Sequence, residues 1–137
     1  MEDCPFCKIA AHELPAEVVS EDEHALAFLD IHPLAPGHTM VIPKVHASTL
    51  ADLPKEEIEP VFKMVRDISK EIGHALGTDS FTIGINQGQA SGQTVDHLHV
   101  HVIPSFPDDG GKSVHSVVHN PPKESVKETA EKIRSAI

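Results

Sequence analysis

Gly92-Gln93-Thr94-Val95-Asp96-His97-Leu98-His99-Val100-His101-Val102-Ile103-Pro104 is the stretch around which the chain is organised. From His97 onward, histidine alternates with an aliphatic residue. This pattern predicts a β-strand, because successive side chains of a strand point to opposite faces. Leu98, Val100 and Val102 would then form the core face. Packing gives no reason for the histidines on the other face, so we look for chemistry there.

Three interpretations of the histidine row are open. The histidines would line a solvent-exposed strand face without a function, or two imidazoles of a His-x-His pair would bind one metal ion. In the third interpretation, a neutral imidazole attacks phosphorus and a neighbouring group assists the movement of the proton. The preceding loop favours phosphate chemistry. Gly88 and Gly92 allow close backbone approach, and backbone amides with Gln93 and Thr94 would donate hydrogen bonds to phosphate oxygens.

The rest of the chain predicts an α+β domain with an antiparallel sheet. Apolar residues recur at helical spacing between Ile58 and Leu76, with Asp52 as the capping residue of this long helix. Pro121 and Pro122 open a charged helix at the C-terminus. Strands are expected at 18–19, 25–30, 39–43 and 81–86, and the loop 87–92 would join the last of them to the histidine strand as a hairpin.

Length and charge narrow the class of protein. A chain of 137 residues is long enough for one domain with a hydrophobic core. The formal net charge of −10 argues against a partner held through its phosphate backbone, so we expect no nucleic acid, but one local site can still bind a small nucleotide. We see no membrane span or secretory signal, and the expected compartment is the cytoplasm.

The two cysteines of the chain form a CxxC motif, Cys4-Pro5-Phe6-Cys7. In a cytosolic protein this spacing indicates either half of a zinc site or a redox pair. The motif alone does not decide between them, because the other two ligands of a zinc site must come from elsewhere in the chain.

Several separated motifs together resemble the histidine-triad (HIT) family, in its form with an N-terminal CxxC known from bacteria and archaea. The resemblance runs from about Cys4 to Phe106 and rests on residues 28–31, 36–44, Asn86, 92–95 and 97–103. It implies the HIT fold, an antiparallel sheet of about five strands with one long helix and a C-terminal helix. Residues 1–106 would be the HIT domain, and 107–137 a tail with a loop and a helix that belongs to the same single domain.

The resemblance also implies an activity, that of a nucleotide hydrolase or transferase acting at the α-phosphate of purine nucleoside conjugates. Phosphoramidates are the preferred substrates. His99 would be the nucleophile and form a covalent nucleotidyl-histidine, while His101 would contact the phosphate and help to manage the proton. The implied catalytic residues are Gln93, Thr94, His97, His99 and His101.

A nucleotide site follows from the same resemblance, with Asp30 as the ligand of the ribose hydroxyls. The implied residues around the nucleotide are Phe6, Ile9, Phe28 and Ile31 for the base, Asn86, Gly92 and Val95 for the phosphate, and His38 as a supporting residue. Each has a purely structural alternative: Asp30 is also an ordinary residue at a strand end, the apolar residues fit a core, and His38 follows a Pro-Gly turn.

The resemblance further implies a zinc site and a homodimer. Some relatives bind one zinc ion through positions that correspond to Cys4, Cys7, His46 and His97, with two reduced thiols and a solvated His46 as the alternative. A homodimer is expected from the family. Three other functions stay open: a dinucleoside polyphosphate hydrolase, a non-catalytic nucleotide-binding or signalling module, and a hydrolase that uses the histidine row as metal ligands. Asp96 departs from the aromatic or apolar residue of many relatives.

Overall fold

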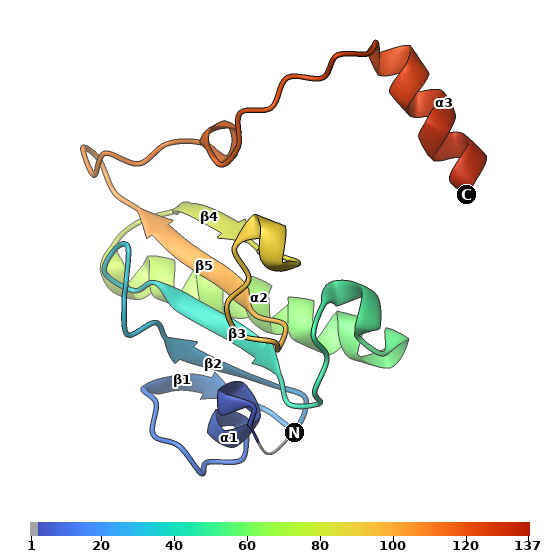
Figure 1. The fold of residues 1–137 in the computed structure, drawn as a ribbon. Coiled ribbons are helices and arrows are strands. Elements are labelled where there is room, and N and C mark those ends of the chain that lie inside the picture. Colours follow the sequence, from blue (N-terminus) through green and yellow to red (C-terminus); the bar gives the residue numbers. More distant parts are fainter. Residues whose placement is uncertain (1–2) are drawn as a thin grey trace.

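The fold is one antiparallel sheet, seen in a computed structural model that describes residues 3–137 (Figure 1). The sheet has five strands in the order β1-β2-β3-β5-β4, and every neighbouring pair is antiparallel. This confirms the predicted fold class. The strands are β1 (Val18–Glu21), β2 (Ala25–Leu29), β3 (Thr39–Pro43), β4 (Ser80–Gly84) and β5 (Val100–Ser105).

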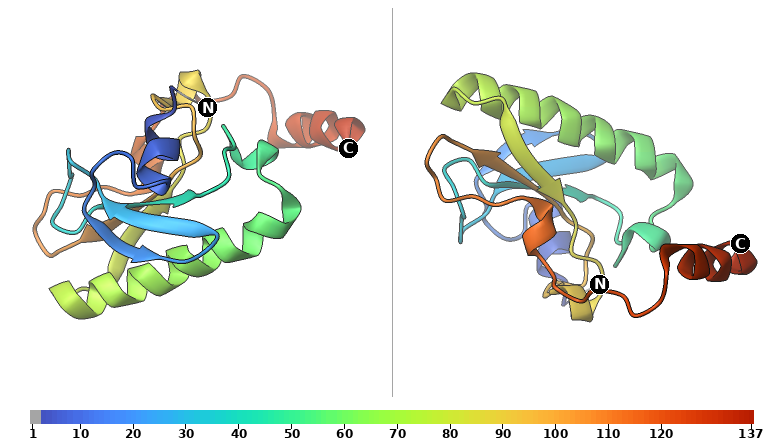
Figure 2. Two further views of the ribbon diagram at one scale, coloured as in Figure 1. Left: turned by 90° about the horizontal axis from the view of Figure 1, so that it is seen from below. Right: turned by 90° about the horizontal axis from the view of Figure 1, so that it is seen from above.

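Helices cover both faces of the sheet. The long helix α2 (Lys55–Leu76) packs on one face, where it contacts β2, β3 and β5, and the short helix α1 (Pro5–Ala10) lies on the opposite face beside β3 (Figure 2). A third helix, α3 (Val126–Ala136), follows the sheet domain. Three single turns of 3₁₀ helix complete the structure: η1 (Leu50–Asp52), η2 (Gln89–Ser91) and η3 (Val114–Ser116).

Two hydrophobic clusters follow from this layering. Alternate residues of β2 point to opposite faces, so Ala25 and Ala27 join the cluster under α2, whereas Leu26 and Phe28 join the cluster beside α1. The predicted core face of the histidine stretch is confirmed: its three aliphatic residues are at most 1% exposed and lie under α2 (Leu98, Val100 and Val102).

The predicted strand through the histidines begins later than expected. Strand β5 starts at Val100, so His97 and His99 lie in an irregular segment before it. The neighbouring strand β3 ends at Pro43, which has no N–H for a sheet ladder. The chain turns here instead, and the N–H of Leu98 donates to the carbonyl of Ala47 at 2.7 Å.

The predicted capping residue of the long helix was wrong. The N-cap of α2 is Pro54, whose carbonyl accepts the N–H of Glu57, while Asp52 lies in η1 and accepts a hydrogen bond from Thr49. Part of the predicted apolar face is buried, joined by Met64, which the periodicity had left out. Other members of that face are 36–43% exposed (Ile58, Phe62 and Leu76).

The tail runs away from the sheet domain. Both figures show α3 at a distance from the sheet, and none of its residues is buried (Figures 1 and 2). The helix begins after Ser125, which forms a capping box with Glu128, rather than directly after the two prolines. That the tail and the sheet form a single domain stays a prediction. Among the described residues, no helix is long and apolar enough to cross a membrane.

Candidate functional site

The three histidines of the organising stretch are enclosed by protein rather than spread along a wet face. His97 is fully buried, His99 is 7% exposed, and His101 is partly buried. Phe6 of α1 lies against the first two, with its ring edge-on to that of His97 at a centroid distance of 6.1 Å and to that of His99 at 5.1 Å. The burial of His97 and His99 contradicts the interpretation of this row as a solvent-exposed strand face.

His99 has a defined tautomer. Its Nδ1 lies 2.8 Å from the carbonyl oxygen of His97. A carbonyl only accepts hydrogen bonds, so Nδ1 must carry the hydrogen, and the neutral ring keeps its lone pair on Nε2. This is the arrangement that a nucleophilic imidazole needs.

His101 stands next to His99, with ring centroids 5.1 Å apart. On its other side, His101 Nδ1 lies 2.9 Å from Nε2 of His38, a residue that is only 3% exposed. Burial lowers the pKa of His101 to about 4, and the charges of His99 and His38 act in the same direction, against that of Asp30. Burial also lowers the pKa of His38. Both rings are therefore neutral at pH 7.

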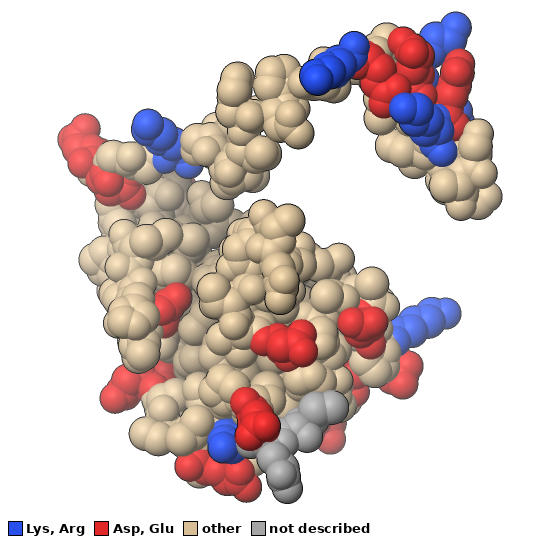
Figure 3. All heavy atoms as spheres, in the orientation of Figure 1, with Lys and Arg blue, Asp and Glu red and all other residues tan. Residues whose placement is uncertain are grey.

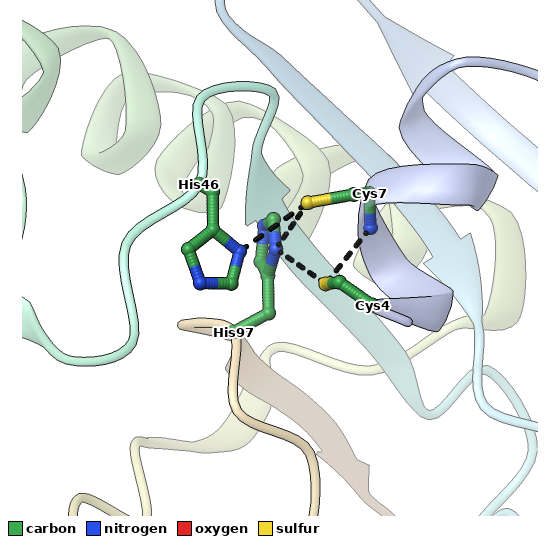
Figure 4. A group of neighbouring side chains, drawn as sticks. All are labelled: Cys4, Cys7, His46 and His97. Atoms are coloured by element: carbon green, nitrogen blue, oxygen red, sulfur yellow. Dashed lines mark hydrogen bonds between the residues drawn. The ribbon is translucent and has the colours of Figure 1, made fainter. Parts of the chain in front are cut away.

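A second group of side chains lies beside the histidine row (Figure 4). It joins Cys4 at the start of α1 and Cys7 within α1, His46 from the loop after β3, and His97. One ligand atom from each residue lies within 4.8 Å of all the others. The sulfurs of Cys4 and Cys7 are 3.3 and 3.4 Å from Nδ1 of His97, and Cys7 is 3.3 Å from Nδ1 of His46. These four residues are close enough to hold one metal ion.

The donor set fits a tetrahedral metal. Typical Zn–S and Zn–N bonds place neighbouring sulfur and nitrogen ligands roughly 3.5 Å apart. His97 donates from Nε2 to the carbonyl of Pro43 at 2.9 Å, which leaves the Nδ1 lone pair directed at the two sulfurs. Metal-binding histidines commonly make such a second hydrogen bond. Burial raises the pKa of Cys7 to about 11, with further contributions from Cys4, so a cation is what would stabilise its thiolate at neutral pH.

Three of the four residues expected around a base lie together. Phe6 and Phe28 are 8% and 3% exposed, their rings meet edge-to-face at 5.5 Å, and Ile9 packs against the same cluster. Ile31 stands apart at 83% exposure in the loop after β2. An exposed side chain is free to close over a ligand, but it is not part of a preformed slot here.

Asp30, the expected ribose ligand, lies at the end of β2 and is partly buried. Its Oδ1 accepts the N–H of His32 at 2.8 Å, and its Oδ2 is 3.5 Å from Nε2 of His38. The carboxylate therefore borders the same histidines as the expected phosphate site.

Much of the loop between β4 and β5 is held by its own side chains. The amide of Gln93 accepts from Gly88 N–H at 2.8 Å and donates to the carbonyls of Ser48 and Val95 at 2.7 and 3.1 Å. Asn86 donates to the carbonyl of Ser91 at 2.8 Å. These two amides shape the loop in this structure, so their expected contact with phosphate stays a prediction.

The other loop residues expected at the phosphate, Gly92, Thr94 and Val95, make no side-chain hydrogen bond to the described residues. Thr94 is exposed and Val95 is partly buried against the α1 cluster. Gly92 has φ +97°, with open space where a Cβ would lie, so glycine is required here by its backbone conformation and not by crowding. The carbonyl of Pro43 and the N–H of Leu34 also orient histidines, but they are backbone groups that no residue pattern could have revealed.

The surface agrees with a local site. On the face shown in Figure 3, acidic side chains are spread over the sheet domain, and the basic side chains in view lie on the tail and at separate places around the edge of the sheet domain, not in one cluster. A phosphate bound at the histidines would thus be held by hydrogen-bond donors close to it.

Comparison with known proteins places this arrangement in a known class. Residues 11–108 match the HIT domain family. An uncharacterized HIT-like protein of Methanocaldococcus jannaschii is 46% identical over 107 residues, which are 78% of this chain and 82% of the relative. The adenosine 5'-monophosphoramidase hnt1 of Schizosaccharomyces pombe is 34% identical over 134 residues, 98% of each chain. A crystal structure from Streptococcus mutans UA159 has a TM-score of 0.87 at 37% identity and covers 99% of this chain and 86% of that one.

Fold and site thus define a class of α+β proteins that have a row of histidines at the sheet and a Cys₂His₂ group beside it. Within this class, the chain belongs to the HIT family.

Proposed function

We propose that this protein is a nucleotide hydrolase or transferase that acts at the α-phosphate of purine nucleoside conjugates, with adenosine 5'-phosphoramidates as the first substrates to test. The observation that carries the proposal is the tautomer of His99, whose Nδ1–H donates to a carbonyl at 2.8 Å and leaves Nε2 as a free base. A relative that matches along 98% of both chains bears the name adenosine 5'-monophosphoramidase.

The reaction proceeds in two substitutions at phosphorus. First, the lone pair of His99 Nε2 forms a bond to phosphorus while the bond to the leaving nitrogen breaks, and that nitrogen keeps the electron pair and takes a proton from water. Then a second water molecule attacks phosphorus, the bond to His99 breaks, and the ring recovers its lone pair, while the proton released by this water neutralises the hydroxide left by the first step. The net change is the addition of one water to the phosphoramidate, which gives the nucleotide and an amine.

The surrounding residues divide the binding of the nucleotide. The carboxylate of Asp30 binds the ribose hydroxyls, and Phe6, Phe28 and Ile9 hold the base, with Ile31 closing over it. Backbone amides at Gly92 and Val95, with Thr94 and His101, bind phosphate oxygens. Gln93 and Asn86 keep the loop in place, and their hydrogen bonds would have to be exchanged before either amide could reach the phosphate.

Two measurements test this proposal together: the turnover of a substrate and the detection of the covalent intermediate on His99. Adenosine 5'-phosphoramidate is incubated with the purified protein, and acid-quenched samples are analysed by mass spectrometry for an adenylyl group on His99. His99→Ala should abolish turnover and keep AMP affinity within a few fold, whereas His119→Ala, in the tail, is the matched control. Full turnover by His99→Ala would exclude this mechanism. AMP binding without any turnover by the wild type would instead favour the non-catalytic module, and turnover of diadenosine polyphosphates alone would favour that class of hydrolase.

We propose zinc as the occupant of the Cys4, Cys7, His46 and His97 group, where it would tie α1 to the segment before β5. A reducing compartment such as the cytoplasm would keep both thiols available as ligands. Zinc content measured by mass spectrometry should be about one per chain and should fall strongly in Cys7→Ser, with His32→Gln as a control outside the group. Chelation should lower the melting temperature before it lowers activity. The opposite order would support a hydrolase that uses the histidine row as metal ligands.

A homodimer is the proposed assembly. Strand β4 is an edge of the sheet, four of its five residues are exposed, and Phe62 of α2 is 36% exposed. Unpaired strand edges and exposed apolar side chains are surfaces that a second copy can cover. Sedimentation velocity would show twice the monomer mass if this is right.

A further inference from the structure

A directed chain of hydrogen bonds connects the backbone of the loop after β2 to the last histidine of the row. The N–H of Leu34 donates to Nδ1 of His38 at 3.1 Å. On the other side of the same ring, Nε2 of His38 lies 2.9 Å from Nδ1 of His101. Because His38 is only 3% exposed, water has little access to replace either bond.

The direction of this chain is set at its backbone end. A backbone N–H can donate but cannot accept, so Nδ1 of His38 must be without hydrogen. The neutral ring then carries its hydrogen on Nε2 and donates it to Nδ1 of His101. His101, neutral and already an acceptor at Nδ1, must carry its own hydrogen on Nε2. One backbone amide thus fixes the tautomers of two imidazoles.

The same logic limits what His101 can do. A cationic His101 would carry a hydrogen on Nδ1 and place it against the N–H of His38. To avoid this, His38 would have to move its hydrogen to Nδ1, where it would meet the N–H of Leu34. The N–H of Leu34 cannot transfer its hydrogen to His38, so these bonds cannot supply a proton to His101. If His101 gave up its Nε2 proton, its ring would remain an imidazolate anion.

A metal ion is disfavoured at this position for the same reason. Ligand atoms of Asp30, His38 and His101 lie within 4.8 Å of one another, as they do in the Cys₂His₂ group. Here, however, Nε2 of His38 holds a hydrogen and has no lone pair to offer. In the Cys₂His₂ group the situation is reversed, because His97 donates to the carbonyl of Pro43 from one nitrogen and keeps the lone pair of the other for a ligand.

We propose that His38 is a positioning residue that locks His101 into the tautomer with its hydrogen on Nε2, so that His101 serves the phosphate as a neutral hydrogen-bond donor and not as a proton donor. His99 presents a lone pair and His101 presents an N–H from adjacent rings, 5.1 Å between centroids. One phosphate group can meet both, with phosphorus at His99 and a non-bridging oxygen at His101. The role at phosphate rests on the proposed function, whereas the tautomer does not.

The charges around His101 agree with this assignment. The titratable groups that face it are His99, His38 and Asp30. Burial and the two histidines lower the pKa of His101 to about 4, and Asp30 opposes them only in part. The ring therefore stays neutral through the physiological range of pH, as a donor requires.

Nitrogen NMR tests the tautomer without any substrate. In the full-length protein labelled with ¹⁵N-histidine, long-range proton–nitrogen spectra at pH 7.5 should show His101 with hydrogen on Nε2 only, the signals being assigned by their loss in His101→Gln. Two variants of His38 form a matched pair: glutamine places an N–H where Nε2 was, and asparagine keeps the partner of Leu34 but does not reach His101. His38→Gln should keep the tautomer of His101, and His38→Asn should release it to a mixture. Hydrogen on Nδ1 in the wild type, or an unchanged single tautomer in His38→Asn, would overturn the proposal.

Kinetics on adenosine 5'-phosphoramidate test the role. His101→Gln keeps an N–H directed at the phosphate but cannot transfer a proton, whereas His101→Asn is too short to reach. We expect kcat to fall about tenfold in the glutamine variant and about 10²–10³-fold in the asparagine variant, as for the loss of one donor to a developing oxyanion. An equal loss of about 10²–10⁴-fold in both would identify His101 as a general acid and refute its assignment as a donor. If the wild type has no turnover, the proposed function fails, and the NMR result still decides whether His38 positions His101.

Discussion

Acidification should destabilise this protein through His101, and the effect can be worked out from its surroundings. His101 has a pKa of about 4 in the folded protein because of burial and of the neighbouring His99 and His38 charges, against 6.5 as the ordinary value. Below pH 6.5 the unfolded chain therefore binds a proton that the folded chain does not. Stability rises with pH wherever the unfolded state binds more protons, so this contribution is complete above pH 6.5 and is lost as pH falls toward 4.

The magnitude follows from the two pKa values. Linkage between 6.5 in the unfolded state and about 4 in the folded state gives a loss of about 2 kcal/mol by pH 5 and about 3 kcal/mol by pH 4, relative to pH 8. Burial lowers the pKa of His38 as well, so the total loss should be larger.

Urea unfolding at a series of pH values measures this directly. A chelator is kept in all samples, because competition between protons and a metal at the cysteine group would add its own pH dependence. The free energy of unfolding of His101→Gln, which does not titrate, should fall less steeply between pH 8 and 5 than that of the wild type, by about 2 kcal/mol over the interval. His119→Gln is the control, since His119 is exposed in the tail. Identical pH dependence in the wild type and His101→Gln would refute the reasoning.

Three further outcomes are expected. Leu98→Ala should destabilise the protein by about 2–5 kcal/mol in urea unfolding, because Leu98 is 1% exposed under α2, whereas Val118→Ala in the tail should change it by less than about 0.5 kcal/mol. Gly37→Ala should lower the melting temperature by several degrees, since Gly37 has φ +85° and a Cβ there would lie 2.5 Å from Cδ1 of Leu76. Gly92→Ala should lower the melting temperature less, because the space around a Cβ at that position is open. A chain ending at Gly111 should keep its melting temperature within about 2 °C, because no side chain beyond this point is buried; a larger drop would show that the tail stabilises the sheet domain.

The sequence alone indicated the fold class and singled out the histidine stretch on which the candidate site is built. Leu98, Val100 and Val102 are apolar at every second position, and a strand converts this spacing into one buried face whatever the rest of the chain does. The apolar repeat of α2 acts in the same way through the helical period. Such local patterns can be recognised in the sequence because an apolar side chain favours burial, so its spacing shows which face of the element is buried.

Element ends were less predictable, since they depend on backbone partners. β5 begins at Val100 because Pro43 ends β3 and the N–H of Leu98 finds Ala47, a residue more than fifty positions away. The helix α2 begins after Pro54 rather than at Asp52 for a similarly local reason, the backbone conformation at the cap. The residue types alone therefore did not predict where β5 or α2 begins.

Only the tertiary structure gave each histidine its own environment. In the sequence, His97, His99 and His101 are equivalent members of one repeat. In the fold, His97 donates to Pro43 and turns its lone pair to two cysteines, His99 donates to a carbonyl and keeps Nε2 free, and His101 accepts from His38. The position of a ring hydrogen is decided by which carbonyl or N–H the fold brings within about 3 Å, and such backbone partners carry no signature in the sequence.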